Sequence, residues 1–315
     1  MCRTRAALAI VAAVLCAGCH SDELDPGARR TTRTEVRELT PAPGEIAMPL
    51  HEGSVRFAVI GDSGRGDDAQ RAIAQQMTAW RAKFPFDFVL MLGDNIYPPH
   101  APDDYVRKFE DPYRALLDAG VTFHAAIGNH DPPVELNYPK FNMEGRRYYT
   151  FRRNEQRLRG LAGAGARFFV LDSRSLDPGQ LKWLRDELAK SETRWKICYM
   201  HHPLYTSGRY GSSARALRLA VEPLLVEGDV DVVLSGHEHF YERTQPRHGI
   251  SYFISGGAGS LRRADIRPSS LTARGFDTDF HFMLMEISGD ELYFQAISRT
   301  GQTVDAGVIT RKPGP

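Results

Sequence analysis

Five apolar segments of this chain each end directly in polar residues of the common metal-ligating types. The segments read VIGD, MLGD, AIGNHD, YMHHP and LSGHEH, and they lie between residues 59 and 239. One such ending is ordinary, because an acid or an amide after a strand often forms a turn or caps a helix. Five of them in one chain restrict the fold, since buried polar side chains cost free energy unless a partner neutralises them.

The segments around these endings alternate between the spacing of strands and the spacing of helices. Helices are predicted at 67–84, 103–120, 178–190 and 214–228, with Pro112 as a break or a first-turn residue in the second of them. Strands are predicted at 55–62, 86–94, 121–131, 166–173, 195–203, 230–239, 250–257, 280–287, 291–298 and 303–310. This alternation, followed by a β-rich end, predicts an α/β layer architecture.

The five polar endings are expected to meet, because the carboxyl ends of strands in an open α/β sheet converge on one crevice. Together they supply seven ligand-type residues: Asp62, Asp94, Asn129, His130, His201, His237 and His239. Positions i and i+2 of an extended strand face the same side, so both imidazoles of GHEH can reach one site. Carboxylates can bridge two cations, and imidazoles with an amide oxygen complete the coordination. The set predicts a two-metal site of the kind that hydrolyses phosphoesters and some amides.

The composition of the chain and the absence of certain motifs argue against several other kinds of site. No thiolate accompanies the ligand cluster, which argues against a structural zinc site; Cys198 lies in an apolar strand, where we expect it to serve packing. No GxxxxGK[ST] loop is present, which argues against nucleotide-driven phosphoryl transfer. The formal net charge is +1, too small to draw the chain onto nucleic acid or acidic membranes. We therefore expect a substrate that is recognised locally, and no nucleic acid as a specific partner.

The motifs GDSG, GDNIY, GNHD, HHP and GHEH, in this order, resemble the five motifs of the calcineurin-like metallophosphoesterases. Other branches of that family carry D-x-H as the first motif, whereas this sequence reads Asp62-Ser63-Gly64. Tyr97 is placed to supply the missing ligand, so the chain is most similar to the small, animal-type purple acid phosphatases. The resemblance covers about residues 55–300. It implies a β-sandwich flanked by helices in αββα layers, which forms a single catalytic domain at 53–311.

The resemblance also implies a role for each ligand-type residue. A ferric ion would be held by Asp62, Asp94, Tyr97 and His239. A second ion, Fe(II), Zn(II) or Mn(II), would be held by Asp94, Asn129, His201 and His237. The implied reaction is phosphomonoester hydrolysis of the acid phosphatase type, in which a water activated by the cations attacks phosphorus and His130 donates a proton to the leaving group. A tyrosinate bound to a ferric ion would colour the protein.

The loop after HHP departs from the family pattern. Relatives often carry a further histidine there, whereas this loop reads LYTSGRYGSSA and has none. His202 and Arg209 are the candidate substrate-binding residues, and Tyr205 and Tyr210 are placed to contact a leaving group. Arg65, directly after GDSG, is a candidate for binding phosphate through its guanidinium. The alternative for each of these is an ordinary loop residue.

The N-terminus has a different character from the rest. A short basic start, MCRTR, precedes an apolar stretch that is shorter than the ~20 residues that cross a bilayer. This pattern predicts a secretory signal at 1–19. The ending LCAGC resembles a bacterial lipoprotein signal with Cys19 as the lipidated residue; the alternative is an ordinary signal that releases a secreted protein. Residues 20–52 are poor in apolar side chains and predict a flexible tether.

Two other functions fit parts of the sequence. A phosphodiesterase or nucleotide-cleaving relative would have an open metal face and a pocket for stacking a base. A lipid-anchored binding protein on the same scaffold would lack some of the ligands, and none of the expected ligands is missing here.

Overall fold

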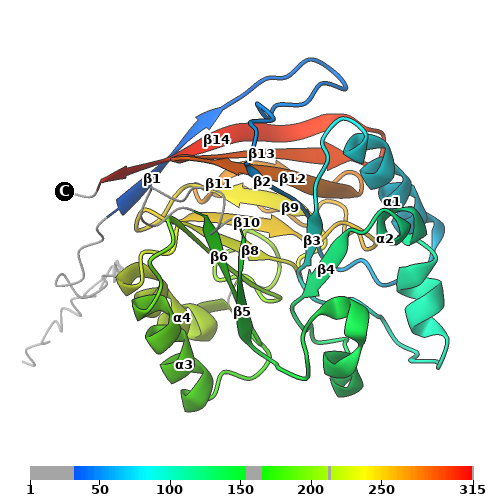
Figure 1. The fold of residues 1–315 in the computed structure, drawn as a ribbon, viewed down its shortest axis with the longest axis horizontal. Helices are drawn as coiled ribbons and strands as arrows, with labels where there is room; N and C mark the ends of the chain where they lie inside the picture. The colour runs from blue at the N-terminus through cyan, green and yellow to red at the C-terminus, as the bar shows by residue number, and fades with distance from the viewer. Residues whose placement is uncertain (1–31, 154–164, 212–213, 314–315) are drawn as a thin grey trace, which may run out of the picture.

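The computed structural model describes residues 32–153, 165–211 and 214–313, and within them two sheets pack face to face with helices on their flanks (Figure 1). The first sheet has the order β1 (Thr32–Glu38), β14 (Thr303–Pro313), β13 (Glu291–Ser298), β12 (His281–Ser288), β2 (Val55–Ile60), β3 (Phe88–Met91) and β4 (Thr122–Ala125). The second has the order β11 (Thr272–Phe276), β9 (Tyr241–Thr244), β10 (Ser251–Ser255), β8 (Val232–Ser235), β7 (Trp195–Met200), β6 (Ala166–Leu171) and β5 (Tyr149–Arg153). The expected β-sandwich flanked by helices is confirmed.

Two of the predicted helices begin at an aspartate cap. Helix α1 (Asp68–Arg81) follows Asp67, whose side chain accepts a hydrogen bond from the backbone N–H of Gln70 at 3.0 Å. Helix α3 (Pro178–Ala189) follows Asp177, which accepts from the N–H of Gln180 at 2.9 Å. Each cap satisfies one of the N–H groups that a helix leaves without an internal partner.

The predicted helix at 103–120 is divided into two short pieces in the structure. A π-helical turn, η1 (Val106–Glu110), and a short helix, α2 (Arg114–Asp118), lie on either side of Pro112. Proline has no N–H to donate, so it interrupts the hydrogen bonding of a helix interior. Helix α4 spans Ala214–Glu227, and two 3₁₀ turns, η2 (Pro133–Asn137) and η3 (Pro139–Phe141), complete the set among the described residues.

The arrangement of parallel strands places the polar endings. In the first sheet β2, β3 and β4 are parallel neighbours, and in the second β6, β7 and β8 are. Each group therefore has its carboxyl ends at one edge of its sheet. The five endings of the sequence follow β2, β3, β4, β7 and β8, so both sheets deliver ligand-type residues to the same end of the sandwich.

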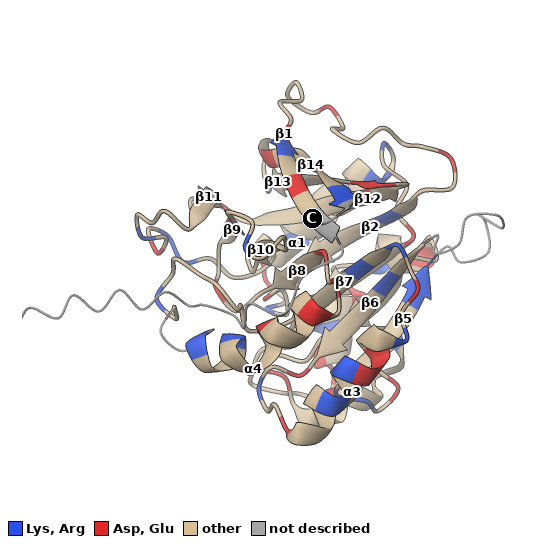
Figure 2. Cartoon of the chain, turned by 90° about the vertical axis from the view of Figure 1, so that its left-hand side faces the viewer, with Lys and Arg blue, Asp and Glu red and all other residues tan. Residues whose placement is uncertain are grey.

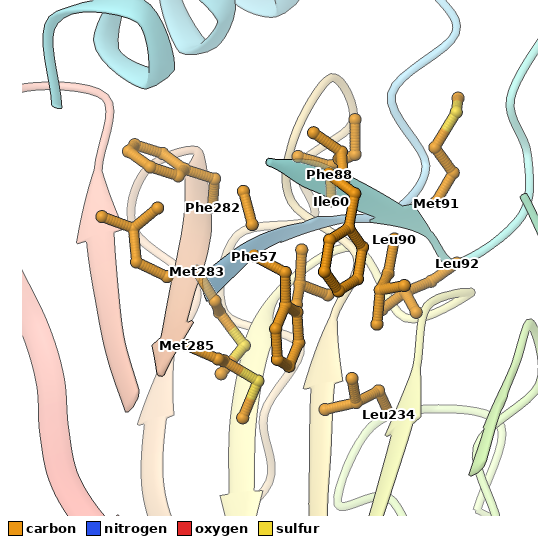
Figure 3. Close-up of a cluster of buried hydrophobic side chains, with 14 of the residues drawn as sticks. Phe57, Ile60, Phe88, Leu90, Met91, Leu92, Leu234, Phe282, Met283 and Met285 are labelled. Carbon is orange, nitrogen blue, oxygen red and sulfur yellow. The ribbon is translucent and has the colours of Figure 1, made fainter. Parts of the chain in front are cut away.

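The core lies between the two sheets and is rich in aromatic side chains (Figure 3). Phe57 of β2 stacks on Phe88 of β3 at 5.2 Å between ring centroids, and it meets Phe168 of β6 edge-on at 5.4 Å. Both faces of β6 are buried: Phe168 packs between the sheets, whereas its neighbour Phe169 packs against α3 and α4. Burial of each such ring stabilises the fold by roughly 1.5–3 kcal/mol.

The predicted tether at 20–52 is wrong for the part that the structure describes. Residues 32–38 form β1, which pairs antiparallel with β14. Glu286 of β12 accepts hydrogen bonds from the backbone N–H groups of Leu50 and His51 at 2.9 and 2.8 Å. The charged composition concealed a strand alternation, in which Thr34 is buried while Glu35 is exposed. The described part of the folded unit thus includes β1, which precedes the predicted boundary at 53.

The predicted signal at 1–19, with Cys19, lies outside the described residues. None of the helices in the described ranges combines the length and apolar character needed to cross a membrane. Figure 2 shows acidic and basic residues interspersed along α3, where Lys182 and Asp186 form an ion pair at 2.6 Å. That face of the molecule carries mixed charge, as the small net charge leads one to expect.

Candidate metal centre

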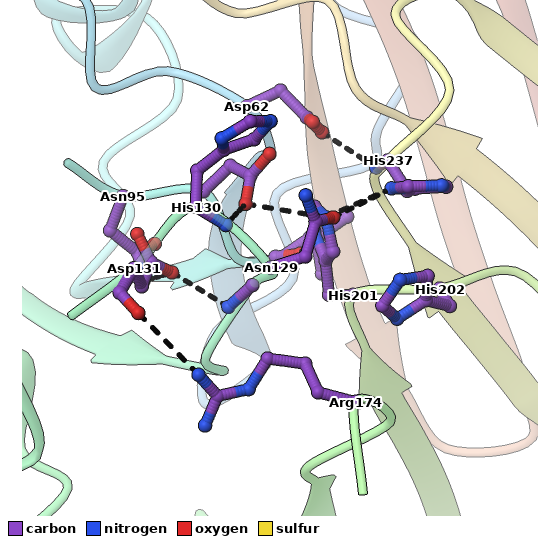
Figure 4. Close-up of polar contacts among 12 residues, drawn as sticks. Asp62, Asn95, Asn129, His130, Asp131, Arg174, His201, His202 and His237 are labelled. Atoms are coloured by element: carbon purple, nitrogen blue, oxygen red, sulfur yellow. Dashed lines mark hydrogen bonds and ion pairs between the residues drawn. The ribbon is translucent and has the colours of Figure 1, made fainter. Parts of the chain in front are cut away.

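The structure brings together all seven ligand-type residues that the sequence singled out, and Figure 4 shows most of them around one centre. Six of them divide into two groups, and the seventh, His130, donates its backbone N–H to Asp94. One group contains Asp62, Asp94 and His239, whose ligand atoms lie within 4.8 Å of one another. The other contains His201 and His237 together with the side chain of Asn129.

The first group, the oxygen-rich subsite, also contains Tyr97. The Tyr97 hydroxyl lies 3.2 Å from Asp62 Oδ1 and 3.1 Å from His239 Nε2. His239 Nε2 is 3.3 Å from the same Asp62 oxygen, so the three side chains converge on one point. The tyrosine three residues after Asp94 thus lies where the sequence placed the missing ligand.

The second group, the nitrogen-rich subsite, converges on the amide oxygen of Asn129. His201 Nε2 lies 2.9 Å from this oxygen and His237 Nδ1 lies 3.0 Å from it. Asp94 lies between the subsites, because its Oδ1 is 3.4 Å from His201 Nε2 while the carboxylate also belongs to the group of Asp62. A carboxylate in this position can bind a cation on each side.

The backbone around the ligands is strained into the left-handed region. Asp62, Asp94 and His237 have φ angles of 56°, 52° and 68°. Such conformations cost residues other than glycine of order 1–3 kcal/mol each, and they persist where the surrounding structure holds them. Here the ligands themselves contribute: Asp62 Oδ2 accepts from the N–H of His237 at 2.8 Å, and Asp94 Oδ1 accepts from the N–H of His130 at 2.9 Å.

Two glycines allow the strand ends to approach closely. A Cβ atom on Gly93, which has φ +89°, would lie 2.6 Å from His201 Nδ1. A Cβ on Gly128 would lie 2.2 Å from the backbone nitrogen of Asp94. A side chain at Gly93 would collide with the ending of β7, and one at Gly128 with the ending of β3, so the glycines of GDNIY and GNHD have a steric reason to be there.

Burial shifts the pKa values of the candidate ligands in the direction that disfavours their charged forms. It raises the pKa of Asp62 to about 8, with the charge of Asp94 adding to the effect, and it lowers the pKa of His237 to about 2 and of His239 to about 4. Burial and the two carboxylates also raise the pKa of Tyr97. Among the described residues no lysine or arginine forms an ion pair with Asp62 or Asp94. Bound cations would supply the missing positive charge, and carboxylate, phenol, amide and imidazole donors suit them.

The turn after β4 is held by Asp131. Its carboxylate accepts from the N–H groups of Gly128 at 2.6 Å and Ile96 at 3.0 Å, and from the amide of Asn95 at 3.1 Å. These bonds connect the GDNIY and GNHD loops behind the ligands. Asp131 therefore orients its neighbours and does not enter the site.

Two arginines near the site have partners of their own. The guanidinium of Arg65 lies over the Tyr97 ring, 3.6 Å from the ring centroid, and its Nε donates to Ser260 at 2.9 Å. Arg65 is exposed and borders the oxygen-rich subsite. Arg209, the candidate substrate-binding residue, forms a salt bridge with Asp265 at 3.1 Å, and its role toward substrate stays a prediction.

The aromatic residues of the loop after HHP separate in the structure. Tyr210 lies against His237, with 4.6 Å between ring centroids. Tyr205 is buried away from the site and donates to Glu222, so its expected contact with a leaving group is wrong. His202 lies beside the nitrogen-rich subsite, with its ring 4.4 Å from that of His237.

Sequence reasoning missed one strand ending that matters here. Strand β6 ends in Asp172 and Ser173, and Ser173 Oγ lies 2.9 Å from His202 Nδ1. The signal was present, because LDS is also an apolar strand that stops at polar residues. A search for metal ligands does not select Ser173, because a serine hydroxyl is not a usual metal ligand.

Comparisons with known proteins agree with this geometry. The family model described as calcineurin-like phosphoesterase matches residues 55–241. Purple acid phosphatase 17 of Arabidopsis thaliana is 29% identical over 259 residues, which cover 71% of this chain and 74% of the relative. Tartrate-resistant acid phosphatase type 5 of Rattus norvegicus is 23% identical and covers 83% and 92% of the two chains.

Solved structures show the same fold in proteins with different roles. GAP50, described as the anchor in the inner membrane complex of Plasmodium, has a TM-score of 0.71 at 20% identity and covers 82% of this chain and 89% of its own. Purple acid phosphatase PPD1 from yellow lupin seeds has a TM-score of 0.63 at 18% identity, covering 87% of this chain and 55% of its own. The fold alone therefore does not decide between a catalyst and an anchor.

Proposed function

Since the chain belongs to the calcineurin-like phosphoesterase family, we propose that it is a phosphomonoester hydrolase of the purple acid phosphatase type with a two-metal centre. The observation that carries the proposal is the pair of subsites that share Asp94. Tyr97 supports the purple acid phosphatase type, because its hydroxyl lies among the donors of the oxygen-rich subsite.

We infer a ferric ion in the oxygen-rich subsite and Fe(II), Zn(II) or Mn(II) in the nitrogen-rich one. Two carboxylates and a phenol are hard donors and favour a ferric ion, whereas imidazoles and an amide suit a divalent ion. When bound, the two cations would neutralise the phosphate charge and lower the pKa of a water molecule. Asp62, Asp94 and Tyr97 would hold the first ion with His239.

His130 is the proposed proton donor to the leaving group. Its backbone N–H is fixed by Asp94, while its side chain is exposed and lies against Tyr97 with 4.9 Å between ring centroids. The imidazole is therefore free to meet substrate from the solvent side of the centre. A general acid at this place would protonate the departing alkoxide, which is a poor leaving group without a proton.

The deciding experiment is metal-dependent hydrolysis with matched esters. The chelated protein is reconstituted with iron and zinc, and cleavage of 4-nitrophenyl phosphate is compared with cleavage of bis(4-nitrophenyl) phosphate. We expect faster turnover of the monoester, and no turnover of either ester before reconstitution. Preference for the diester would move the protein to the phosphodiesterase alternative. No turnover with two ions bound would favour a binding role on this scaffold.

We also propose export of the protein to the cell envelope, with a lipid anchor at Cys19. The proposal is supported by the basic start, the short apolar stretch and the LCAGC ending of the sequence. Mass spectrometry of the N-terminal peptide from the native host tests it: a diacylglyceryl group on Cys19 is expected. An unmodified N-terminus just after a signal cut would instead indicate a secreted protein.

A further inference from the structure

The end of β6 holds one histidine of the site by both its backbone and its ring. Ser173 Oγ accepts a hydrogen bond from the backbone N–H of His202 at 2.9 Å, and it lies 2.9 Å from Nδ1 of the same residue. Asp172, directly before it, is buried and forms salt bridges with Arg147 and Arg174, both at 3.0 Å. The position of Ser173 is therefore fixed by the salt bridges of the residue before it.

The hydrogen bonds of Ser173 favour one tautomer of His202. A serine hydroxyl has one hydrogen to donate, and among the described residues its contacts are those with His202. The backbone N–H occupies one lone pair of the hydroxyl oxygen and leaves its hydrogen, which we infer is donated to Nδ1. An Nδ1 atom that accepts carries no proton, and the proton of the neutral imidazole is then on Nε2.

His201 is held in the opposite tautomer. Its Nδ1 lies 2.9 Å from the backbone oxygen of Leu92, which can only accept, so Nδ1 carries the proton. Nε2 of His201 is left with a lone pair, and this atom faces Asn129 and Asp94. A carbonyl that fixes a ligand in this way is the usual arrangement behind a metal-bound imidazole.

The two neighbouring histidines therefore differ in the ring nitrogen opposite their hydrogen-bond partner: Nε2 carries a lone pair in His201 and a proton in His202. The ligand atoms of His201, His202 and His237 lie within 4.8 Å of one another, and Figure 4 shows the three rings around the same space. By proximity alone all three would count as metal ligands. The hydrogen-bond partners of the rings distinguish His201 from His202. A metal ion binds a nitrogen with a lone pair, whereas an oxyanion binds a nitrogen that donates a proton.

We propose that Ser173 positions His202 as an Nε2–H donor to a phosphate oxygen at the nitrogen-rich subsite, and that His202 is not a metal ligand. This inference rests on the proposed function and names a further substrate-binding contact for it. A phosphate oxygen carries the charge that a preorganised N–H donor stabilises best. Ser173 itself touches no substrate and is a positioning residue.

The test compares two adjacent alanine variants in metal content and in phosphate binding. His202→Ala should keep two ions per chain by elemental analysis and bind inorganic phosphate about 10-fold to 100-fold more weakly by isothermal titration calorimetry. His201→Ala should lose one of the two ions. His202→Gln retains an N–H donor and should recover part of the phosphate affinity, which separates the lost hydrogen bond from a packing defect.

A second measurement reads the tautomer without any metal. In the metal-free protein labelled with ¹⁵N-histidine, long-range ¹H–¹⁵N spectra should report His202 protonated at Nε2 and His201 protonated at Nδ1. Ser173→Ala should release the His202 preference and leave that of His201 unchanged. The same variant should weaken phosphate binding by up to about tenfold, since the ring loses its orientation.

Three results would overturn the inference. One is loss of an ion in His202→Ala, which would make His202 a ligand; another is phosphate affinity equal to wild type in that variant. The third is an Nδ1–H tautomer for His202. Failure of the proposed function has a different signature, because it appears in the wild-type protein as absent metal or absent phosphatase activity. The tautomer spectra remain decisive for Ser173 even then.

Discussion

The two subsites differ in donor chemistry and in exposure, although the same ends of the sheets build both. The oxygen-rich subsite is formed by buried Asp62, Asp94 and Tyr97 with one half-buried imidazole, that of His239. The nitrogen-rich subsite combines buried His201 with Asn129 and His237, which reach solvent. The subsite with more oxygen donors is thus also the more buried of the two. The closed subsite suits an ion that is retained, and the open one suits an ion that meets substrate.

The surroundings reinforce this difference. Behind the oxygen-rich subsite Lys108 is buried and donates to the backbone oxygen of Tyr97 at 2.5 Å and to that of Pro99 at 3.0 Å. The nitrogen-rich subsite is bordered by Tyr210 and His202, whose rings lie within 4.6 and 4.4 Å of the His237 ring. The first environment fixes a ligand loop, whereas the second forms a rim on which selectivity among substrates can depend.

Asp94→Ala should have the largest effect, because both subsites lose the ligand that they share. We expect the reconstituted variant to bind fewer than two ions and kcat to fall about 10³-fold or more. Elemental analysis and steady-state kinetics measure this, with the exposed Asp68→Ala as the matched control. Retention of both ions and most of the activity would show that the subsites are independent.

His130→Ala should have the next largest effect, and the effect should depend on the leaving group. Loss of a general acid typically costs 10²–10⁴-fold, so hydrolysis of an alkyl phosphate should slow by about 10²-fold or more. The 4-nitrophenyl ester, whose leaving group needs little protonation, should slow much less. An equal loss with both esters would assign His130 to binding and not to proton transfer.

Tyr97→Phe separates the subsites by removing the hydroxyl from one of them. The ring is buried, and phenylalanine keeps its packing, so far-UV circular dichroism should match wild type. Any visible absorption band should disappear, while the divalent ion of the nitrogen-rich subsite is retained. A variant that keeps the wild-type spectrum would remove Tyr97 from the set of ligands.

The smallest effect that we predict is a pH dependence of stability in the metal-free protein. Burial raises the pKa of Asp62 to about 8 from its ordinary 3.8, so the folded chain keeps a proton that the unfolded chain releases. Stability from this group therefore falls as pH rises toward 8, by at most about 1.4 kcal/mol per pH unit. The lowered pKa of His237, about 2 against 6.5, acts in the opposite direction, and its gain is complete near pH 6.5.

Between pH 6.5 and 8 the Asp62 effect remains, and it acts in the same direction as those of Asp131, whose pKa burial raises to about 7, and Glu135, whose pKa burial also raises. Urea unfolding of the metal-free protein across this range should show declining stability, and Asp62→Asn should flatten the decline. A stability that rises from pH 6.5 to 8 in both proteins would contradict the assignment of burial as the dominant cause. Reconstitution with metal should abolish the decline, because bound cations favour the ionised carboxylate.

Much of the fold and the candidate site could be predicted because their signals are local. The ten predicted strands appear in the structure, because a short continuous apolar run such as FDFVLML indicates both the length of a strand and its burial. Asp62, Asp94 and His201 were placed together by a topological rule, which needs only that strand ends be recognised. Tyr97 was predicted to join them from the family resemblance, and its hydroxyl lies beside Asp62.

What could not be predicted depends on partners that are distant in the sequence. Strand β1 has the alternation of an edge strand, but its charged composition hid this, and only pairing with β14 orders it. Tyr205 and Tyr210 lie in the same loop, yet Tyr205 is buried, where its hydroxyl donates a hydrogen bond to Glu222 of α4. The tautomer of His202 depends on Ser173, which is 29 residues away in the chain.

A visible absorption spectrum of the purified, oxidised protein, with metal analysis on the same sample, tests the two-metal centre most directly. We predict two ions per chain, at least one of them iron, and a broad band in the green-to-red range from a tyrosinate bound to a ferric ion. A colourless protein that holds two zinc or manganese ions would contradict the assignment of the oxygen-rich subsite. A protein that binds no metal after reconstitution would contradict the two-metal centre itself.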